Sequence, residues 1–241
     1  MPPITDSDTK NRGERSSQTS SSLLAPAIIA IILQLVIATL GVTVYFTATG
    51  SSTGEPPAGV LYSVSGISLL ITLGLLWWYL SPQQRQAAFP LHRLSRAELG
   101  WTLVFVPLGI LAFLGGEQLG ILVGGEPIAF DYDVTNPVTL IGLLLGPILV
   151  SPWVEEFLYR GILIQALEDR GWSILAVGIA SVGVFALAHG FILGIAGIFA
   201  IAGMAVFPTV LRLKFESITG ACLHHFLNNI VAYLVTPFFF F

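Results

Sequence analysis

Long apolar runs separated by short polar segments dominate this chain of 241 residues. Seven runs are near or above the roughly 20 residues that a helix needs to cross the hydrocarbon core of a bilayer. They are Leu23–Ala48, Val60–Leu80, Leu99–Val123, Pro137–Leu167, Trp172–Gly190, Phe191–Leu211 and Ser217–Phe238. The fifth and sixth form one unbroken stretch, which we divide at His189-Gly190-Phe191 because glycine permits a tight turn. The pattern predicts an all-α fold, a polytopic transmembrane helical bundle of about seven helices.

Composition supports a multi-pass membrane protein. Hydrophobic residues make up 54% of the chain and charged residues only 10%, whereas soluble domains are about 25% charged. Membrane lipid is therefore an expected partner. The net charge of −4 and the lack of a basic run argue against nucleic acid as a partner. Cys222 is the single cysteine, so no disulfide framework is expected.

The chain divides into three parts. Residues 1–22 are hydrophilic and Ser-rich, which is typical of a disordered N-terminal tail. Residues 23–136 hold three transmembrane helices with little polar material. Residues 137–241 hold the polar clusters, so we expect the four C-terminal helices to form a catalytic core around a polar cavity.

The distribution of charge predicts a cytoplasmic N-terminus. All ten Lys and Arg fall in the tail, the second loop, the fourth-to-fifth connection with the helix end before it, and the sixth-to-seventh loop. The opposite loops carry Glu55, Glu126, Asp131 and Asp133 and no Lys or Arg. This asymmetry follows the positive-inside rule. An odd number of helices then puts the Phe-rich C-terminus outside.

Two adjacent acids, Glu155 and Glu156, interrupt the fourth apolar run. A charged group at the centre of a bilayer costs about 3 kcal/mol on insertion scales, so such residues rarely persist without a task. Arg160 follows Glu156 by four residues and can pair with it, while Glu155 points about 100° away and stays free to act as a general base. The alternative is a Glu156–Arg160 brace at the inner membrane edge, with Glu155 solvated there.

A helix start is predicted just before these acids. Ser151 followed by Pro152 is typical of an N-cap and the first helical position. The sequence therefore predicts that a helix restarts here and that both acids lie near its N-terminus.

Histidines and asparagines supply further polar groups in later apolar runs. His189 lies in the fifth run, and the seventh holds two i,i+4 pairs, His224 with Asn228 and His225 with Asn229. Each pair can direct a ring N–H and an amide N–H₂ toward one point, as an oxyanion hole requires. The alternative is helix packing through these polar side chains. Spacing alone does not choose between the two pairs.

Three ordered motifs resemble those of the CPBP family of intramembrane proteases. They are Glu-Glu-x-x-x-Arg (Glu155, Glu156, Arg160), Phe-x-x-x-His (Phe185, His189) and His-x-x-x-Asn (His225, Asn229). That family includes type II CAAX prenyl endopeptidases and bacteriocin-processing or immunity proteins, and the resemblance covers roughly residues 137–236. The register from Ser217-Ile218 onward favours His225 with Asn229.

The resemblance implies that Glu155 with His189 activates water, that Glu156 and Arg160 support the site, and that His225 and Asn229 stabilise the oxyanion. The family is often labelled metalloprotease, but this chain has no His-Glu-x-x-His motif. If a metal is present, Glu155, His189 and His225 would hold zinc with an open fourth position. We favour general-base catalysis without a metal or other cofactor.

These observations predict an intramembrane endopeptidase that hydrolyses a peptide bond of a membrane-associated peptide or protein, with prenylated CAAX-type substrates as candidates. One alternative is a non-catalytic immunity or scaffolding membrane protein. Another is a proton-coupled transporter, against which the lack of an internal repeat argues. The oligomeric state is not indicated by the sequence.

Overall fold

A computed structural model describes residues 23–50, 56–129 and 132–236, and every regular element in these ranges is a helix. The elements, with η for π-helical segments, are α2 (Leu24–Thr49), α3 (Ala58–Tyr79), α4 (Pro82–Ala88), α5 (Arg96–Leu122), α6 (Pro137–Leu143), η1 (Leu144–Val150), α7 (Ser151–Glu156), η2 (Phe157–Leu163), α8 (Ile164–Glu168), α9 (Ile174–Phe215), α10 (Thr219–Ile230) and η3 (Val231–Val235). The predicted all-α bundle is confirmed. The predicted disordered tail lies outside the described residues.

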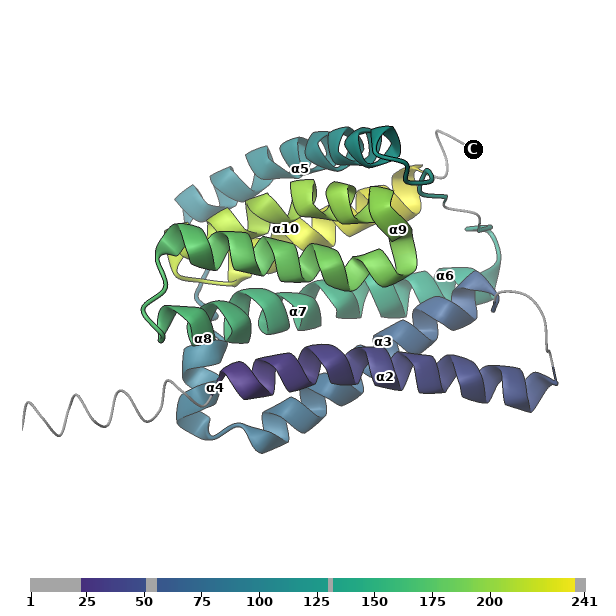
Figure 1. Cartoon of the computed structure of the whole chain (residues 1–241), viewed down its shortest axis with the longest axis horizontal. Helices are drawn as coiled ribbons and strands as arrows, with labels where there is room; N and C mark the ends of the chain where they lie inside the picture. Colours follow the sequence, from purple (N-terminus) through teal and green to yellow (C-terminus); the bar gives the residue numbers. More distant parts are fainter. Residues whose placement is uncertain (1–22, 51–55, 130–131, 237–241) are drawn as a thin grey trace, which may run out of the picture.

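Five helical stretches in the described ranges are long and apolar enough to cross a membrane. The fourth is the continuous stretch from α6 through α8, and the fifth is α9. Helix α9 reverses direction at Gly194, where φ is 65° and ψ is −162°, and Figure 1 shows it as a hairpin. Counting its two arms separately and adding α10 with η3 gives the seven passes that the apolar runs predict.

The turn between the fifth and sixth passes lies four residues later than predicted. Gly190 stays helical and instead permits close packing, because a Cβ there would lie 2.6 Å from the Ile198 side chain. Gly194 carries the positive φ that other residues rarely adopt. The later turn keeps His189 inside a helix rather than at its end.

A substitution at this turn tests its role. We expect Gly194→Ala to destabilise the protein by about 1–3 kcal/mol, because an alanine would be held in a backbone conformation that strains it. Nothing lies within 4 Å of the added Cβ, so the effect is conformational. Gly183→Ala is the matched control, since that position is helical and also open. Thermal unfolding in detergent compares the two, and equal midpoints would contradict the assignment.

The stretch from α6 through α8 runs through the middle of the molecule (Figure 1). Helices α2 and α3 pack on one side of it, and α9, α10 and α5 lie on the other. Helices α5 and α9 approach closely, since a Cβ at Gly203 would lie 2.5 Å from the carbonyl oxygen of Ala112. Small residues at helix contacts allow this kind of packing within a membrane.

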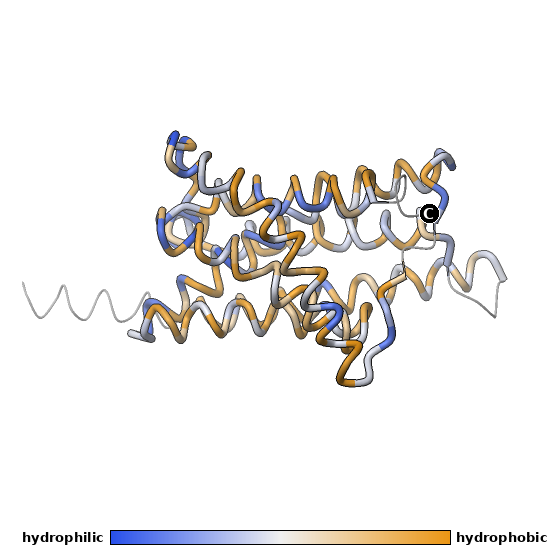
Figure 2. Tube along the Cα trace, turned by 90° about the horizontal axis from the view of Figure 1, so that it is seen from above, coloured by the Kyte–Doolittle hydropathy of each residue, from blue (hydrophilic) through white to orange (hydrophobic). Residues whose placement is uncertain are grey.

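Hydrophobic residues predominate along the helices, and many of the hydrophilic residues lie near helix ends (Figure 2). Helix α2 is an example, because Ile29 and Val44 are more than half exposed although both are large and apolar. Water would not stabilise such a surface, whereas lipid does. The protein is therefore a multi-pass membrane protein.

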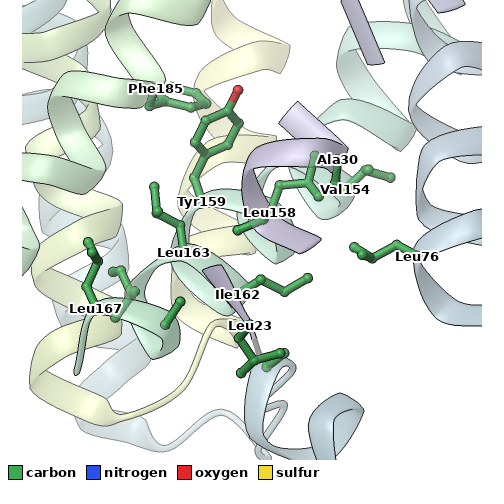
Figure 3. Packing of buried hydrophobic residues seen from close by; sticks show 14 of the residues in the cluster. Leu23, Ala30, Leu76, Val154, Leu158, Tyr159, Ile162, Leu163, Leu167 and Phe185 are labelled. Carbon is green, nitrogen blue, oxygen red and sulfur yellow. The ribbon is translucent and has the colours of Figure 1, made fainter. Parts of the chain in front are cut away.

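A hydrophobic cluster joins α2 to the central stretch and to α9 (Figure 3). Leu158, Tyr159 and Ile162 from η2 are fully buried in it, together with Ala30 of α2 and Phe185 of α9. The rings of Tyr159 and Phe185 meet edge to face, with centroids 4.9 Å apart. This cluster fixes η2 and the first arm of α9 relative to each other, and both carry residues of the site.

Candidate active site

The predicted helix start at Ser151 is wrong, because the helix continues through this point. Ser151 has helical φ and ψ, its backbone N–H bonds to Gly146, and no side-chain cap is made at the start of α7. A π-helical segment shifts backbone bonds to i,i+5 and is common at functional sites. In that pattern the carbonyl of Pro147 faces Pro152, which has no N–H to donate. The Pro147 carbonyl is thus free and accepts from Asn229 Nδ2 at 2.7 Å.

The two adjacent acids lie in different surroundings, and Glu156 is the buried one. Its Oε1 accepts from Arg160 at 3.0 Å, and both side chains are 0% exposed. The same oxygen lies 3.0 Å from Nδ1 of His225. Arg160 also donates to Thr209 and to the Ala205 carbonyl. The ion pair of Glu156 and Arg160 is therefore buried and connects three passes. The alternative, in which Glu155 is solvated beside a surface brace, does not agree with this burial.

Glu155 faces the two histidines. Ser151 donates to its Oε1 at 2.5 Å. Its Oε2 lies 3.8 Å from Nε2 of His189 and 3.9 Å from Nε2 of His225. That oxygen is buried and has no hydrogen-bond partner within the described ranges. Both separations are longer than a direct hydrogen bond, and they are short enough that one water oxygen could lie about 2.8 Å from the oxygen and from either nitrogen.

Hydrogen bonds at Nδ1 orient both imidazole rings. Nδ1 of His189 lies 2.9 Å from the Phe185 carbonyl, which can only accept, so this nitrogen carries a hydrogen. Nδ1 of His225 likewise lies within hydrogen-bond distance of the Glu156 carboxylate, at 3.0 Å from Oε1. Phe185 packs against both rings, at 4.5 Å from His189 and 6.0 Å from His225 between centroids. Each ring therefore presents Nε2 toward Glu155.

The pair formed by His224 and Asn228 faces another way. His224 is fully buried, and its Nε2 lies 3.1 Å from the Phe105 carbonyl on α5. Asn228 Nδ2 donates to the His224 carbonyl, and Phe207 stacks on the imidazole ring. This pair joins α10 to its neighbours, whereas His225 and Asn229 lie on the side of Glu156 and Pro147. Spacing left the two pairs open, and only the second lies at the acids.

Six predicted site residues come together here, from three passes: Glu155, Glu156, Arg160, His189, His225 and Asn229. The remaining C-terminal pass contributes Thr209 and Ala205 to Arg160. One hydrogen of the Asn229 amide is used by Pro147, which leaves one for another acceptor. Glu155 and His189 keep 12% and 24% of their side chains exposed, although Oε2 of Glu155 itself is buried. The chemical roles of these residues stay predictions.

Three residues near the acids were missed from the sequence: Ser151, Tyr159 and Gln34. Ser151 precedes Glu155 by four residues and Tyr159 follows it by four, so helical spacing alone could have found both. Gln34 is an amide in an otherwise apolar stretch of α2, which is a recognisable signal of an interhelical contact. Its Nε2 donates to the Tyr159 hydroxyl at 3.2 Å.

The side chains of Glu155, His189 and His225 lie slightly farther apart than the ligands of a bound zinc ion. Among the described residues, no group of three or more His, Cys, Asp or Glu side chains is arranged to hold a metal ion. Tetrahedral zinc binds nitrogen and oxygen at about 2.0–2.1 Å, which places two ligands about 3.4 Å apart. The separations of 3.8 and 3.9 Å from Glu155 to His189 and His225 are wider.

Comparison with known proteins agrees with the motifs. Residues 137–231 match the family described as Rce1-like, type II CAAX prenyl endopeptidase Rce1-like. No curated protein and no solved structure matches the chain. The matched segment runs from the start of α6 to the first residue of η3 and includes all six predicted site residues. The resemblance predicted from the motifs is confirmed, and the match supports a CAAX-type intramembrane protease in general.

Proposed function

We propose that this protein is an intramembrane endopeptidase that hydrolyses a peptide bond of a membrane-associated substrate. The observation that carries the proposal is the meeting of Glu155 Oε2 with Nε2 of His189 and of His225, at 3.8 and 3.9 Å. This carboxylate oxygen has no hydrogen-bond partner among the described residues and is flanked by two imidazole nitrogens, so it is suited to hold one water and accept its proton. The family match supports the same class of reaction.

In the proposed reaction, Glu155 is the general base. It takes a proton from the water with the help of His189, and the water oxygen forms a bond to the carbonyl carbon of the scissile peptide. Ser151 holds Oε1, so Oε2 is the oxygen that faces the water. The proton then passes from Glu155 to the leaving nitrogen, and the C–N bond breaks. The immediate products are one carboxylic acid and one amine, and the acid then passes its proton to the amine or to water and becomes a carboxylate, so atoms and charges balance.

The oxyanion of the tetrahedral intermediate needs donors. His225 binds Glu156 through Nδ1, so a ring protonated at both nitrogens can donate from Nε2 to the oxyanion. The second amide hydrogen of Asn229 is the other proposed donor. Glu156 acts through His225, and Arg160 holds Glu156 in place with bonds to the sixth pass. Glu156 and Arg160 are thus proposed as supporting residues.

For the substrate, we propose a peptide carried at the membrane by lipid, and a prenylated CAAX-type peptide is the first to test. For the orientation, we propose a cytoplasmic N-terminus. Among the described residues, the basic side chains near helix ends lie on α4, at the start of α5 and at the C-terminal ends of α8 and α9. These helix ends lie together at one end of the bundle (Figure 1). The positive-inside rule assigns such an end to the cytoplasm.

Product analysis tests the function. The purified protein in lipid nanodiscs is incubated with a farnesylated CAAX peptide in water enriched in ¹⁸O, and products are identified by mass spectrometry. We expect two fragments, with one ¹⁸O in the new carboxylate. Intact peptide after prolonged incubation with this substrate and with unprenylated membrane peptides would favour the immunity or scaffolding alternative. Proton uptake into sealed proteoliposomes without cleavage would favour the transporter.

The two histidines of α10 give a matched comparison. We expect His225→Ala to lower kcat by about 10²–10³, because the oxyanion loses a donor. His224→Ala should destabilise the contact with α5, yet each folded molecule should keep most of its activity. Both are assayed at equal concentrations of folded protein. An inactive His224→Ala beside an active His225→Ala would reverse the assignment of the two pairs.

A further inference from the structure

Helix α5 lies outside the segment that matches the family, yet it packs against α10 (Figure 1). Helix α10 carries His225 and Asn229, the two proposed donors to the oxyanion. These side chains bind Glu156 and Pro147, and both contacts lie in the C-terminal half of the helix. A helix that is held only there can still tilt, so the contacts at its start also determine where the two donors lie.

The start of α10 is capped by a side chain from α5. Ile218, at the N-cap position, has an apolar side chain and makes no cap bond. The first N–H groups of a helix have no acceptor within it. One of them is the N–H of Gly220, which donates to Oε1 of Glu98 at 2.9 Å. A carboxylate at this place also interacts favourably with the positive end of the helix dipole.

Glu98 is a buried acid, with 3% of its surface exposed. In the part of the chain that the structure describes, it forms no ion pair with Lys, Arg or His. Burying a charge is costly unless it has a partner, and the start of α10 supplies that contact. Gly220 permits the approach, because a Cβ there would lie 2.8 Å from Oε1 of Glu98 and 3.1 Å from the hydroxyl oxygen of Thr102.

We propose that Glu98 is a positioning residue for the reaction, which acts through α10 and does not touch the substrate. Its bond to Gly220 fixes the start of the helix, and the fixed start sets the direction in which His225 and Asn229 present their hydrogens. Gly220 precedes His225 by five residues, so a shift at the start is passed on through little more than one helical turn. This inference rests on the proposed function and adds a residue from outside the matched segment.

Glu98→Ala tests the proposal. We expect kcat to fall about ten- to a hundredfold, since a small misplacement of groups at a reaction centre has effects of this size, while KM stays within about twofold. Glu98→Gln keeps an oxygen that can accept from Gly220 and should retain kcat within about threefold. Glu117→Ala is the matched control, because Glu117 lies on the same helix and likewise accepts a backbone N–H at 2.9 Å, from Ile128 in the connection to α6.

A double variant distinguishes positioning from a general loss of structure. Gly220 and Asn229 lie nine residues apart, about 13 Å along the helix, and substitutions at such a distance normally have independent effects that multiply in kcat. If Glu98 acts through α10, the loss caused by Glu98→Ala should shrink about fivefold or more in an Asn229→Ala background, because one of the misplaced donors is already absent. Losses that multiply fully, or an equal loss of kcat in Glu117→Ala, would overturn the proposal. All rates are compared at equal concentrations of folded protein.

Cys222 reports on the start of α10 without any turnover. It is the single cysteine of the chain, lies two residues after Gly220 and is fully buried. We expect N-ethylmaleimide to label Cys222 about tenfold faster in Glu98→Ala than in the wild type, because the start of α10 opens more often. Glu117→Ala should be labelled at the wild-type rate. Mass spectrometry of the protein in lipid nanodiscs measures the labelling.

Labelling and cleavage together separate the two proposals. If the wild type cleaves peptides and Glu98→Ala has the same kcat and labelling rate, only the positioning role is wrong. If no peptide is cleaved while Glu98→Ala is labelled faster, the proposed hydrolysis is wrong and the contact that holds α10 stands. Where Glu98→Ala does not fold, Glu98→Asp takes its place. Its carboxylate reaches one carbon less, so both effects are expected at smaller size, and their absence would overturn the proposal.

Discussion

Glu155→Gln is expected to lower kcat by about 10²–10⁴, the range in which a general base contributes, while the fold stays intact. The glutamine amide keeps the shape of the side chain and can still accept from Ser151, but it cannot take a proton from water. Among the described residues, the groups that could pair with Glu155 lie at 3.8 and 3.9 Å, farther than Arg160 lies from Glu156, so we expect the loss of its charge to leave the bundle stable. Initial rates on a cleaved peptide, with thermal unfolding measured in parallel, check both halves of this expectation.

Glu126→Gln is the control for this variant, because Glu126 is an exposed acid in the connection between α5 and α6. Its activity should equal that of the wild type. If purified Glu155→Gln cleaved peptide at the rate of this control, Glu155 would not be the base.

Breaking the Glu156–Arg160 pair is expected to cost about 3–5 kcal/mol of stability, since each single substitution leaves a buried charge without its partner. Both side chains are fully buried, and Arg160 binds the sixth pass as well. Arg160→Met should therefore unfold at a markedly lower temperature and also lose activity, because Glu156 no longer holds His225 in place. Unfolding in detergent and peptide hydrolysis measure the two effects.

The double variant Glu156→Met with Arg160→Met separates the effect on stability from the effect on activity. Replacing a whole buried pair by apolar residues is often neutral, so we expect the double variant to regain stability without regaining activity. A single Arg160→Met variant as stable as the wild type would show that the pair does not hold these passes together.

Part of this molecule is predictable from the sequence for simple reasons. Apolar run length reports membrane crossings, and i,i+4 spacing reports side chains on one helix face, so the seven passes and the pairing of Glu156 with Arg160 follow directly. The turn of α9 was displaced because Gly190 and Gly194 offer the same freedom to the chain. The structure places the turn at Gly194, and Gly190 stays helical at a close contact with Ile198.

Other features depend on contacts that spacing does not encode. The bond from Asn229 to Pro147 arises because a π-helical segment sets that carbonyl opposite Pro152, and no local pattern announced this shift. Serine is a common helix N-cap residue, yet the Ser151 hydroxyl donates a hydrogen bond to the Glu155 carboxylate instead. Spacing alone did not choose between His225 and His224, the register of the family motif favoured His225, and the structure shows why His224 is different, since it lies next to the Phe105 carbonyl of α5.

An experimental structure of the wild type in lipid, at a resolution that shows ordered water, tests the central claim most directly. We predict one water within about 3 Å of Oε2 of Glu155 and of Nε2 of His189 or His225, with Glu156 still bound to Arg160. The account would be contradicted by a structure in which Glu155 points away from both histidines, or in which a metal ion bound by these three side chains takes the place of the water.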